Sequence, residues 1–371
     1  AADGGVIGRI VSGRGILDRW IPGDRILSIE PVISWADTSR SFTTSDGSLP
    51  LDEGMQIVTH IRISVQGWSP EGIDTTAAKS VEHLLLSLND GRLHVGRASS
   101  THIRDERRSG EEVPQELNRP RREGAVTVRT RGTSRGAVYV YTADVPSNPG
   151  HTLVGQVVHG IELAKLAREG DTLCVGIGPG LLDFRGLAVD QAMKLAEENQ
   201  VGTELDISAP DDRVVVAQVP ETTLEILSAK HVRLATAPLS KVITVALDSI
   251  RAPLSVALFR MITGLHSHGI GSLPLFFMYE DVYLFKPAIP RGMQILPENT
   301  PSGEVPAGTL AITNDARRGA GLIGVRTRPN NEFGPTSEPF EGTNILGTIT
   351  DLEKLATASE KDIVYVKELK G

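Results

Sequence analysis

A five-residue pattern that recurs three times is the feature of this sequence that most restricts its fold. The pattern reads apolar, apolar, Gly, polar, apolar, and its copies span 6–10, 153–157 and 345–349. An acidic turn that opens another apolar run follows each copy at nearly the same distance, at Asp24, Asp171 and Asp362. Self-similarity of this kind indicates a structural unit that the chain repeats.

Each unit is predicted to run strand, helix, several strands, short helix and strand. After the repeated glycine, apolar residues at helical spacing predict short helices over 161–167 and 352–356. Upstream, longer amphipathic helices are predicted over 77–86 and 252–262, each preceded by a strand, over 56–65 and 241–247. Short Val, Ile and Leu runs separated by 38 Gly and 22 Pro are typical of strands joined by turns. The fold class is therefore mainly β, of the α+β kind.

The repeat divides the chain into four parts. Residues 1–33 are predicted to be the tail of a truncated first unit, because the chain opens abruptly into Gly-Gly-Val-Ile-Gly. Complete units are predicted over 34–175 and 236–371, which are ordinary domain lengths. Between them, 176–235 is interpreted as a small βαβ-like connector, with one helix before a strand over 213–219.

Composition excludes several classes of protein. A net charge of -8 lacks the basic field of a nucleic-acid-binding chain. A single Cys excludes a disulfide framework, and it excludes an iron–sulfur cluster held by this chain alone. The most apolar stretches, 242–262 and 273–285, contain charged residues, so no membrane span is predicted, and no secretory signal opens the chain. We therefore expect a cytoplasmic protein without nucleic-acid or membrane partners.

Three local features are predicted to have a structural role and no catalytic or binding role. Residues 97–120 lack an apolar period and are predicted to form a solvated loop. The Gly-Ile-Gly-Pro-Gly run over 176–180 lacks the Lys and Ser or Thr of a phosphate-binding turn, so we predict a bend into the connector. Cys174 lies between Leu173 and Val175 and is predicted to be a buried core thiol.

The central part of the chain resembles the cyclophilins. The resemblance is carried by a Gly-led strand, a Gly-initiated aromatic strand and a His-containing strand, over 124–132, 136–141 and 150–163. It implies tandem units that are each an eight-stranded antiparallel β-barrel with two short end helices.

Nearly the whole chain resembles the archaeal methanogenesis marker protein 3 family, whose members carry cyclophilin-like domains. The residues that carry this resemblance span 23–31, 80–83, 150–155, 218–224, 259–265, 297–299, 321–326, 333–340 and 343–345. It implies a role in methanogenesis, or in its reversal, with methyl-coenzyme M reductase subunits and other activation-complex proteins as partners. Those partners would carry the nickel tetrapyrrole, iron–sulfur clusters and ATP, because this chain has no ligands for them.

The catalytic pattern of cyclophilins is incomplete in this sequence. His151 and Tyr139 match the family, but Val138 stands where the family places Gln, and no Phe-His-Arg motif supplies the Arg. In the last copy, Thr343 and Asn344 replace the His-containing turn. No catalytic residue is therefore assigned, and we predict a non-catalytic scaffold that acts as an assembly or activation factor. A peptidyl-prolyl cis-trans isomerase is the alternative.

A candidate pocket for a partner or ligand surrounds the loop over 333–338. Its residues, together with the two cyclophilin-like positions, are Tyr139, His151, Glu298, Arg326, Gly334, Pro335, Thr336 and Asn344. Gly-Pro followed by Thr and Glu can shape a receiving loop. Two alternatives stay open: a rigid connection, and a surface ion pair between Arg326 and Glu298.

A candidate basic docking patch comprises Arg119, Arg121, Arg122, Arg129 and Arg131. Aromatic residues are almost absent from this segment, which favours an acidic protein over single-stranded nucleic acid. The alternative is a charged rim that is balanced by Glu111, Glu112, Glu116 and Glu123. No metal site is predicted: His266 and His268 lack a carboxylate nearby in the sequence and are interpreted as part of a solvated loop.

Overall fold

The computed structural model describes residues 19–25, 42–44, 48–50, 53–55, 57–69, 71–206, 212–290 and 292–369. The chain divides into two compact units, Ala1–Gly47 and Ser48–Gly371. The first copy of the repeated pattern, and all of the predicted tail over 1–33 except 19–25, lie outside the described residues.

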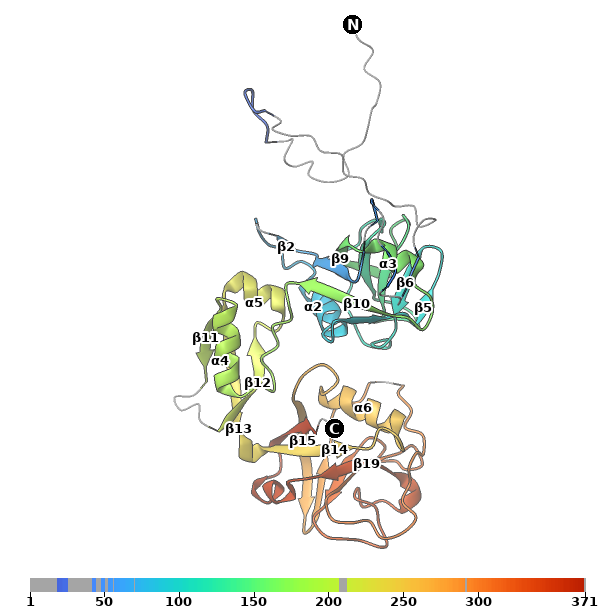
Figure 1. Ribbon diagram of the computed structural model, residues 1–371. Helices are drawn as coiled ribbons and strands as arrows, with labels where there is room; N and C mark the ends of the chain where they lie inside the picture. Colours follow the sequence, from blue (N-terminus) through green and yellow to red (C-terminus); the bar gives the residue numbers. More distant parts are fainter. Residues whose placement is uncertain are drawn as a thin grey trace. The chain divides into compact units, whose positions relative to one another are not determined.

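Seven strands close into a barrel in the C-terminal part of the chain (Figure 1). Their order is β14-β19-β17-β18-β16-β15-β20, and their bounds are Val242–Leu247, Thr343–Ile349, Thr309–Thr313, Ile323–Arg326, Val282–Phe285, Gly271–Tyr279 and Ile363–Glu368. Alternate side chains such as Leu310 and Ile312 fill the interior, as the period of two in a strand requires. Helix α6 (Pro253–Thr263) contributes Val256 and Phe259 to the same core.

A second, eight-stranded sheet precedes the barrel in the chain. Its order is β4-β10-β1-β9-β7-β8-β6-β5, and its bounds are Arg92–His94, Thr172–Gly178, Ile61–Val65, His151–His159, Ala125–Arg129, Val138–Tyr141, His102–Asp105 and Arg97–Ala98. Helix α2 (Ala78–Ser87) packs Val81, Leu84 and Leu85 into its core, and the short α3 (Ile161–Leu166) packs Ala164 there. A two-stranded hairpin, β2 (Trp68–Ser69) and β3 (Gly72–Ile73), lies between β1 and α2 in the chain.

The sheet and the barrel share one strand order. From β10 the sheet runs β1, β9, β7, β8, β6, and from β20 the barrel runs β14, β19, β17, β18, β16. The prediction of an eight-stranded barrel in each unit is corrected in two ways: among the described residues the first unit forms an eight-stranded sheet that is not a closed barrel, and the C-terminal barrel has seven strands. There β15 is one continuous strand that pairs with β20 through its first half and with β16 through its second half. In the sheet, two short strands, β4 and β5, make the corresponding pairs.

Glycine is required in both described copies of the repeated pattern for the same structural reason. A Cβ on Gly347 would lie 2.0 Å from Ala246 O, and one on Gly155 would lie 2.9 Å from Ser64 O. Both glycines face the first strand of their sheet next to a register shift in the neighbouring strand pair. The motif that is visible in the sequence is therefore the mark of a close approach between two backbones.

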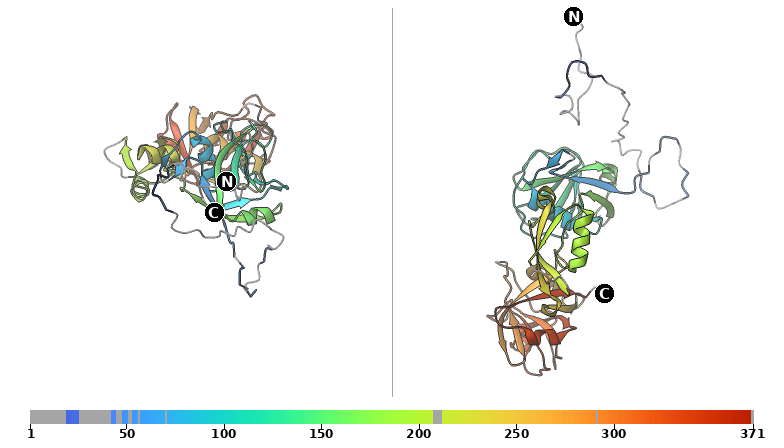
Figure 2. Two further views of the ribbon diagram at one scale, coloured as in Figure 1. Left: turned by 90° about the horizontal axis from the view of Figure 1, so that it is seen from above. Right: turned by 90° about the vertical axis from the view of Figure 1, so that its left-hand side faces the viewer.

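The connector between the sheet and the barrel is a three-stranded sheet with two helices (Figure 2). Its strand order is β11-β13-β12 (Gly202–Leu205, His231–Pro238, Arg213–Val219), and its helices are α4 (Val189–Glu198) and α5 (Thr223–Ala229). The predicted strand over 213–219 is confirmed. The prediction of one helix missed α5, which spans only seven residues. Three short 3-10 helices complete the described elements: Leu239–Lys241, Phe340–Gly342 and Leu352–Thr357.

Two local predictions are wrong. Residues 97–120 are not simply a solvated loop, since they contain β5 and β6, and Asp105 and Arg108 are buried. These strands are short and contain only one strongly apolar residue, Ile103, while His102 and Arg104 pair with Tyr141 and Tyr139 on the other face, so the segment shows no apolar period. Cys174 is exposed rather than buried, because it lies on β10 where that strand pairs with the short β4.

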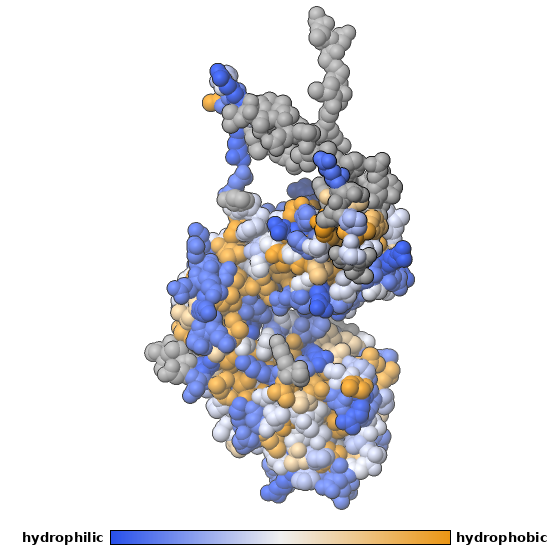
Figure 3. All heavy atoms as spheres, in the orientation of Figure 1, coloured by the Kyte–Doolittle hydropathy of each residue, from blue (hydrophilic) through white to orange (hydrophobic). Residues whose placement is uncertain are grey.

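The described part of the chain contains no helix that is both long enough and apolar enough to cross a membrane. On the face drawn in Figure 3, hydrophobic and hydrophilic residues are interspersed.

Candidate functional site

Aromatic and imidazole side chains gather on the outer face of the first sheet. The strand registers place Tyr139 beside Arg104 and Thr127, and Tyr141 beside His102. The rings of Tyr139 and His151 meet edge to face with their centroids 4.8 Å apart, and His102 lies 5.1 Å from Tyr139. We call His102, Tyr139, Tyr141 and His151 the aromatic cluster. Of these, only Tyr139 and His151 are expected from the sequence; His102 lies on β6, in the segment for which the sequence predicts a solvated loop.

The hydrogen bonds of His151 define its tautomer. Its Nε2 lies 3.4 Å from Arg129 Nη1, and its Nδ1 lies 3.0 Å from Thr127 Oγ1. A guanidinium can only donate, so Nε2 accepts and Nδ1 carries the proton. Burial, followed by the positive charges of Arg121 and Arg129, lowers the pKa of His151 from 6.5 to about 3. The ring is therefore neutral at physiological pH.

Arginine side chains close this face. Tyr139, Tyr141 and His151 are only 2–3% exposed. Arg104 Nη1 donates to Tyr139 Oη at 3.2 Å, and Arg121 Nη1 donates to Tyr141 Oη at 2.7 Å. The guanidinium of Arg121 also stands over the Tyr141 ring, 5.0 Å from its centroid. A peptide would reach these rings only after both arginines moved.

The strands of the C-terminal barrel pair in the same register as those of the first sheet, but the side chains on the outer face differ. Val126 pairs with both Gly155 and Val140, and Leu310 pairs with both Gly347 and Val325. Counting from these pairs, Gly324 occupies the position of Tyr139, and Thr343 occupies the position of His151. The aromatic cluster therefore has no counterpart in the barrel.

The chain's own loop fills the place of the missing cluster. Gly334, Pro335 and Thr336 are all buried. A Cβ on Gly324 would lie 2.5 Å from Pro335 O and 2.7 Å from Thr336 Cα. Thr336 Oγ1 lies 3.2 Å from Thr343 Oγ1. A partner-binding role for these loop residues stays a prediction.

The variant Gly324→Val tests this packing. Its side chain would meet the loop backbone, so the loop must leave the face or the strand must shift. We expect a loss of about 2–3 kcal/mol in the free energy of unfolding, measured by chemical denaturation. Gly303→Ala is the control, because a Cβ there meets nothing within 4 Å. Equal stability of the two variants would contradict the close packing.

Glu298 and Asn344 of the predicted pocket do lie in contact, but their hydrogen bonds hold the start of helix α6. The Glu298 carboxylate accepts from Ser255 N at 2.8 Å and from Leu254 N at 3.2 Å, at the start of α6. Asn344 Oδ1 accepts from Glu298 N at 3.0 Å. Arg326 pairs instead with Asp281 at 3.2 Å, so the predicted alternative of an Arg326–Glu298 ion pair is wrong. The first sheet repeats this helix support: Glu116 accepts from Ser80 N and donates through its own N–H to Thr152 Oγ1.

The predicted basic patch is not balanced by the glutamates of its sequence neighbourhood. Glu111 pairs with Arg108, Glu112 with Arg135 and Glu123 with Lys165, while Glu116 caps α2 as described. The balanced-rim alternative is therefore wrong as far as ion pairs between described residues are concerned.

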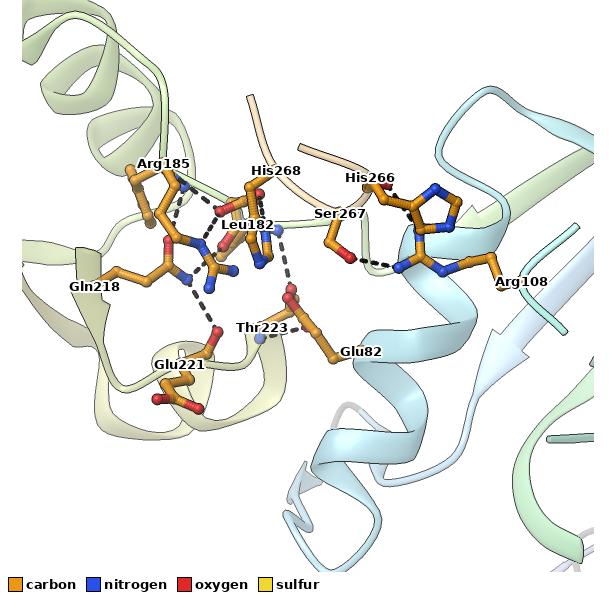
Figure 4. A network of polar contacts seen from close by, with 12 residues as sticks. Glu82, Arg108, Leu182, Arg185, Gln218, Glu221, Thr223, His266, Ser267 and His268 are labelled. Carbon is orange, nitrogen blue, oxygen red and sulfur yellow. Dashed lines mark hydrogen bonds and ion pairs between the residues drawn. The ribbon is translucent and has the colours of Figure 1, made fainter. Parts of the chain in front are cut away.

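A polar network joins α2, the connector and the loop after α6 (Figure 4). Glu82 of α2 points at the start of α5, where its Oε2 accepts from Thr223 N at 2.8 Å. Within the described residues, its Oε1 has no hydrogen-bond partner. Burial raises the pKa of Glu82 to about 7, although the bonds from Thr223 and the charge of Arg185 oppose the rise. Gln218 ties the connector together by accepting from Phe184 N and donating to Leu182 O and Glu221 O.

The loop over 266–268 is held by this network and is not simply solvated, as its sequence suggested. His266 Nε2 lies 2.7 Å from Glu111 Oε1, and His268 Nδ1 lies 2.8 Å from Asp183 Oδ2. Arg108 donates to His266 O and to Ser267 Oγ (Figure 4). Glu111 and Asp183 come from distant parts of the sequence, so their proximity to these histidines is not visible in the local sequence. No group of three or more His, Cys, Asp or Glu side chains that could hold a metal ion occurs among the described residues.

A cavity of about 230 Å³ lies beside this network. Its polar lining includes Arg185, Gln218, Glu221, His268 and Tyr365. Arg185 and His268 are both engaged by Asp183. Of these lining groups, His268 links the connector to the loop after α6 through Asp183, whereas Arg185 and Gln218 bind other connector residues.

Comparisons with known proteins point to a single family. The chain is 39% identical over 369 residues to a UPF0288 protein of Methanosarcina barkeri, covering 98% of this chain and 69% of that protein. It is 38% identical over 375 residues to a UPF0288 protein of Methanopyrus kandleri, covering 98% and 70%. A UPF0288 protein of Methanothermobacter thermautotrophicus is 34% identical, with 99% and 69% covered.

One domain model and one solved structure add to these relatives. The model of a family described as "Putative peptidyl-prolyl cis-trans isomerase domain" matches residues 243–369, which is the C-terminal barrel. A crystal structure of a conserved Enterococcus faecalis protein of unknown function shares 17% identity over 29% of this chain and 28% of that one, with a TM-score of 0.21. From the relatives, the chain belongs to the UPF0288 protein family of methanogenic archaea.

Proposed function

We propose that this UPF0288 protein is a non-catalytic scaffold, built from two copies of one cyclophilin-like unit, that assists the assembly or activation of methyl-coenzyme M reductase in the cytoplasm. The observation that carries the non-catalytic part is the closure of both outer faces. Arg104 and Arg121 close the face of the first sheet. The segment Gly334 to Thr336 closes the face of the barrel.

Three correspondences support two copies of one unit. The strand orders match, the repeated glycines approach the first strand in the same way, and a glutamate caps the first helix in each part. The match of the isomerase-domain model to the barrel supports a cyclophilin-like unit.

The closed faces argue against rapid isomerisation. Rotation about a peptide bond faces a barrier of about 18–20 kcal/mol, and an enzyme lowers it only by contact with the prolyl segment. In the barrel, Gly324 and Thr343 offer neither an aromatic ring nor an imidazole at the positions of Tyr139 and His151. A scaffold needs only surfaces that hold other proteins.

The link to the reductase is supported by the family resemblance and by the relatives, all of which are from methanogens. The nickel tetrapyrrole, iron–sulfur clusters and ATP would be bound by partner proteins. This chain would contribute docking surfaces.

Affinity purification from a methanogen under strict anaerobiosis tests the scaffold role. Mass spectrometry should find reductase subunits and activation proteins enriched at least tenfold over a tagged unrelated protein of similar charge. Recovery of the tagged chain without any reductase subunit would contradict the proposal.

A prolyl isomerase is the second candidate, favoured by one observation. His151, Tyr139, Arg104 and Arg121 together supply imidazole, aromatic and guanidinium groups on one face. If this face opens to substrate, the chain should accelerate cis-to-trans conversion in a proline peptide, and His151→Ala should abolish the acceleration. A rate equal to that in buffer would remove this candidate.

A further inference from the structure

The arginine patch, which comprises Arg119, Arg121, Arg122, Arg129 and Arg131, carries positive charge that the described residues do not neutralise. None of the five forms an ion pair with a carboxylate in the part of the chain that the structure describes. The glutamates nearest in sequence are engaged elsewhere, as shown above. Local positive charge on a chain of net charge -8 is therefore available to an anionic group from outside.

Two of these arginines are held in place without using a carboxylate. Arg121 donates to Pro146 O and to Tyr141 Oη, and Arg129 donates to Arg131 O. Arg121 donates to Tyr141, and Arg129 donates to His151. The ring centroids of Tyr141 and His151 are 6.3 Å apart, so the two arginines bind neighbouring rings. Preorganised guanidinium groups lose little freedom when they bind, and their planar fork matches a carboxylate.

The effect of this charge appears inside the protein. After burial, the charges of Arg121 and Arg129 are the next causes of the lowered pKa of His151. For His102, the next cause after burial is Arg104, which lies outside the patch, and Arg121 lowers the pKa further. Arg119, Arg122 and Arg131 are exposed, so the field also reaches solvent.

The geometry favours a protein carboxylate over nucleic acid. Binding of single strands relies on exposed aromatic rings on which bases stack. Tyr139 and Tyr141 are 3% and 2% exposed, so they offer no such surface. We propose that the arginine patch docks an acidic segment of a partner protein. This inference deepens the proposed scaffold function, since it names the chemistry of one partner.

Fluorescence anisotropy with the full chain tests the inference. The probe is a labelled twelve-residue peptide in which Glu alternates with Gly. The patch variant combines Arg119→Glu, Arg122→Glu and Arg131→Glu, all at exposed positions. Its matched control combines Arg168→Glu, Arg318→Glu and Arg328→Glu, which are also exposed and change the net charge equally.

We expect the Kd for the peptide to rise at least tenfold in the patch variant and less than twofold in the control. Added salt should weaken wild-type binding, because exposed charges are screened. Equal weakening in both variants would overturn the inference, since it would mean attraction by overall charge. It would also be overturned if a twelve-nucleotide uridine RNA bound through the patch while the peptide did not.

The inference can fail separately from the proposed function. If reductase subunits still co-purify with the patch variant and the peptide does not bind the wild type, the scaffold role stands and the acidic-segment inference is wrong.

Discussion

Replacing His151 by glutamine is expected to make the protein less sensitive to acid than the wild type. In the folded state, burial and the charges of Arg121 and Arg129 lower the pKa of His151 from 6.5 to about 3. Below about pH 6.5 the unfolded chain binds a proton that the folded chain does not bind. The stability that depends on neutral His151 is therefore complete above about pH 6.5, and it is lost as the pH falls toward 3.

The size of this effect follows from the pKa difference. One pH unit between the two pKa values changes the free energy of unfolding by about 1.4 kcal/mol. Between about pH 6.5 and about pH 4.5, the wild type should lose about 2–3 kcal/mol more than His151→Gln, as measured by urea unfolding at several pH values. His159→Gln is the control, since His159 lies exposed at the end of the same strand. If His151→Gln and the wild type lose stability in parallel, the ring is not buried as described.

Replacing Glu82 by glutamine is expected to change the pH dependence of stability in the opposite direction, over a pH range that overlaps with that of His151. Burial raises the pKa of Glu82 from 4.5 to about 7, so the folded state keeps a proton that the unfolded state releases. The stability from protonated Glu82 is complete below about pH 4.5 and is lost as the pH rises through about 7. Relative to Glu82→Gln, the wild type should lose about 3 kcal/mol from about pH 4.5 to about pH 7.

The glutamine variant keeps the contact between α2 and α5. Its amide oxygen can accept from Thr223 N, as Glu82 Oε2 does now, and it does not ionise. Glu112→Gln is the control, because Glu112 is 88% exposed. An identical pH dependence in Glu82→Gln and the wild type would show that Glu82 is ionised and solvated in the folded protein.

Measuring both single variants gives a more decisive test than measuring either one alone. Each removes one group, and the expected changes in slope have opposite signs between about pH 4.5 and about pH 6.5. A nonspecific loss of packing would shift both curves downward without tilting them in opposite directions.

Much of the backbone could be predicted from the sequence. The helices after the first strand of each part and the strand over 213–219 reflect local periods of 3.6 and two residues. The segment over 97–120 could not be predicted in this way. Its strands β5 and β6 place Arg97, His102 and Arg104 in the sheet, where ring and guanidinium contacts replace the usual apolar pattern.

The candidate site was only partly predictable. Tyr139 and His151 were identified, but their closure by Arg104 and Arg121 depends on strands and loops that pair at long range. Gly334 to Thr336 stood out in the sequence as a special loop, yet nothing local indicated that the loop covers Gly324.

The repeated glycine pattern and the mainly β class can be recognised from the amino-acid sequence alone, because they follow from spacing along the chain. Side-chain partners required the tertiary structure. Glu111 for His266, Asp183 for His268 and Thr223 for Glu82 lie 85 to 155 positions apart, and only the packing of sheet, connector and barrel brings them together. Local periodicity specifies which face of a strand or helix is buried, whereas the groups that meet at that face are specified by contacts between distant segments.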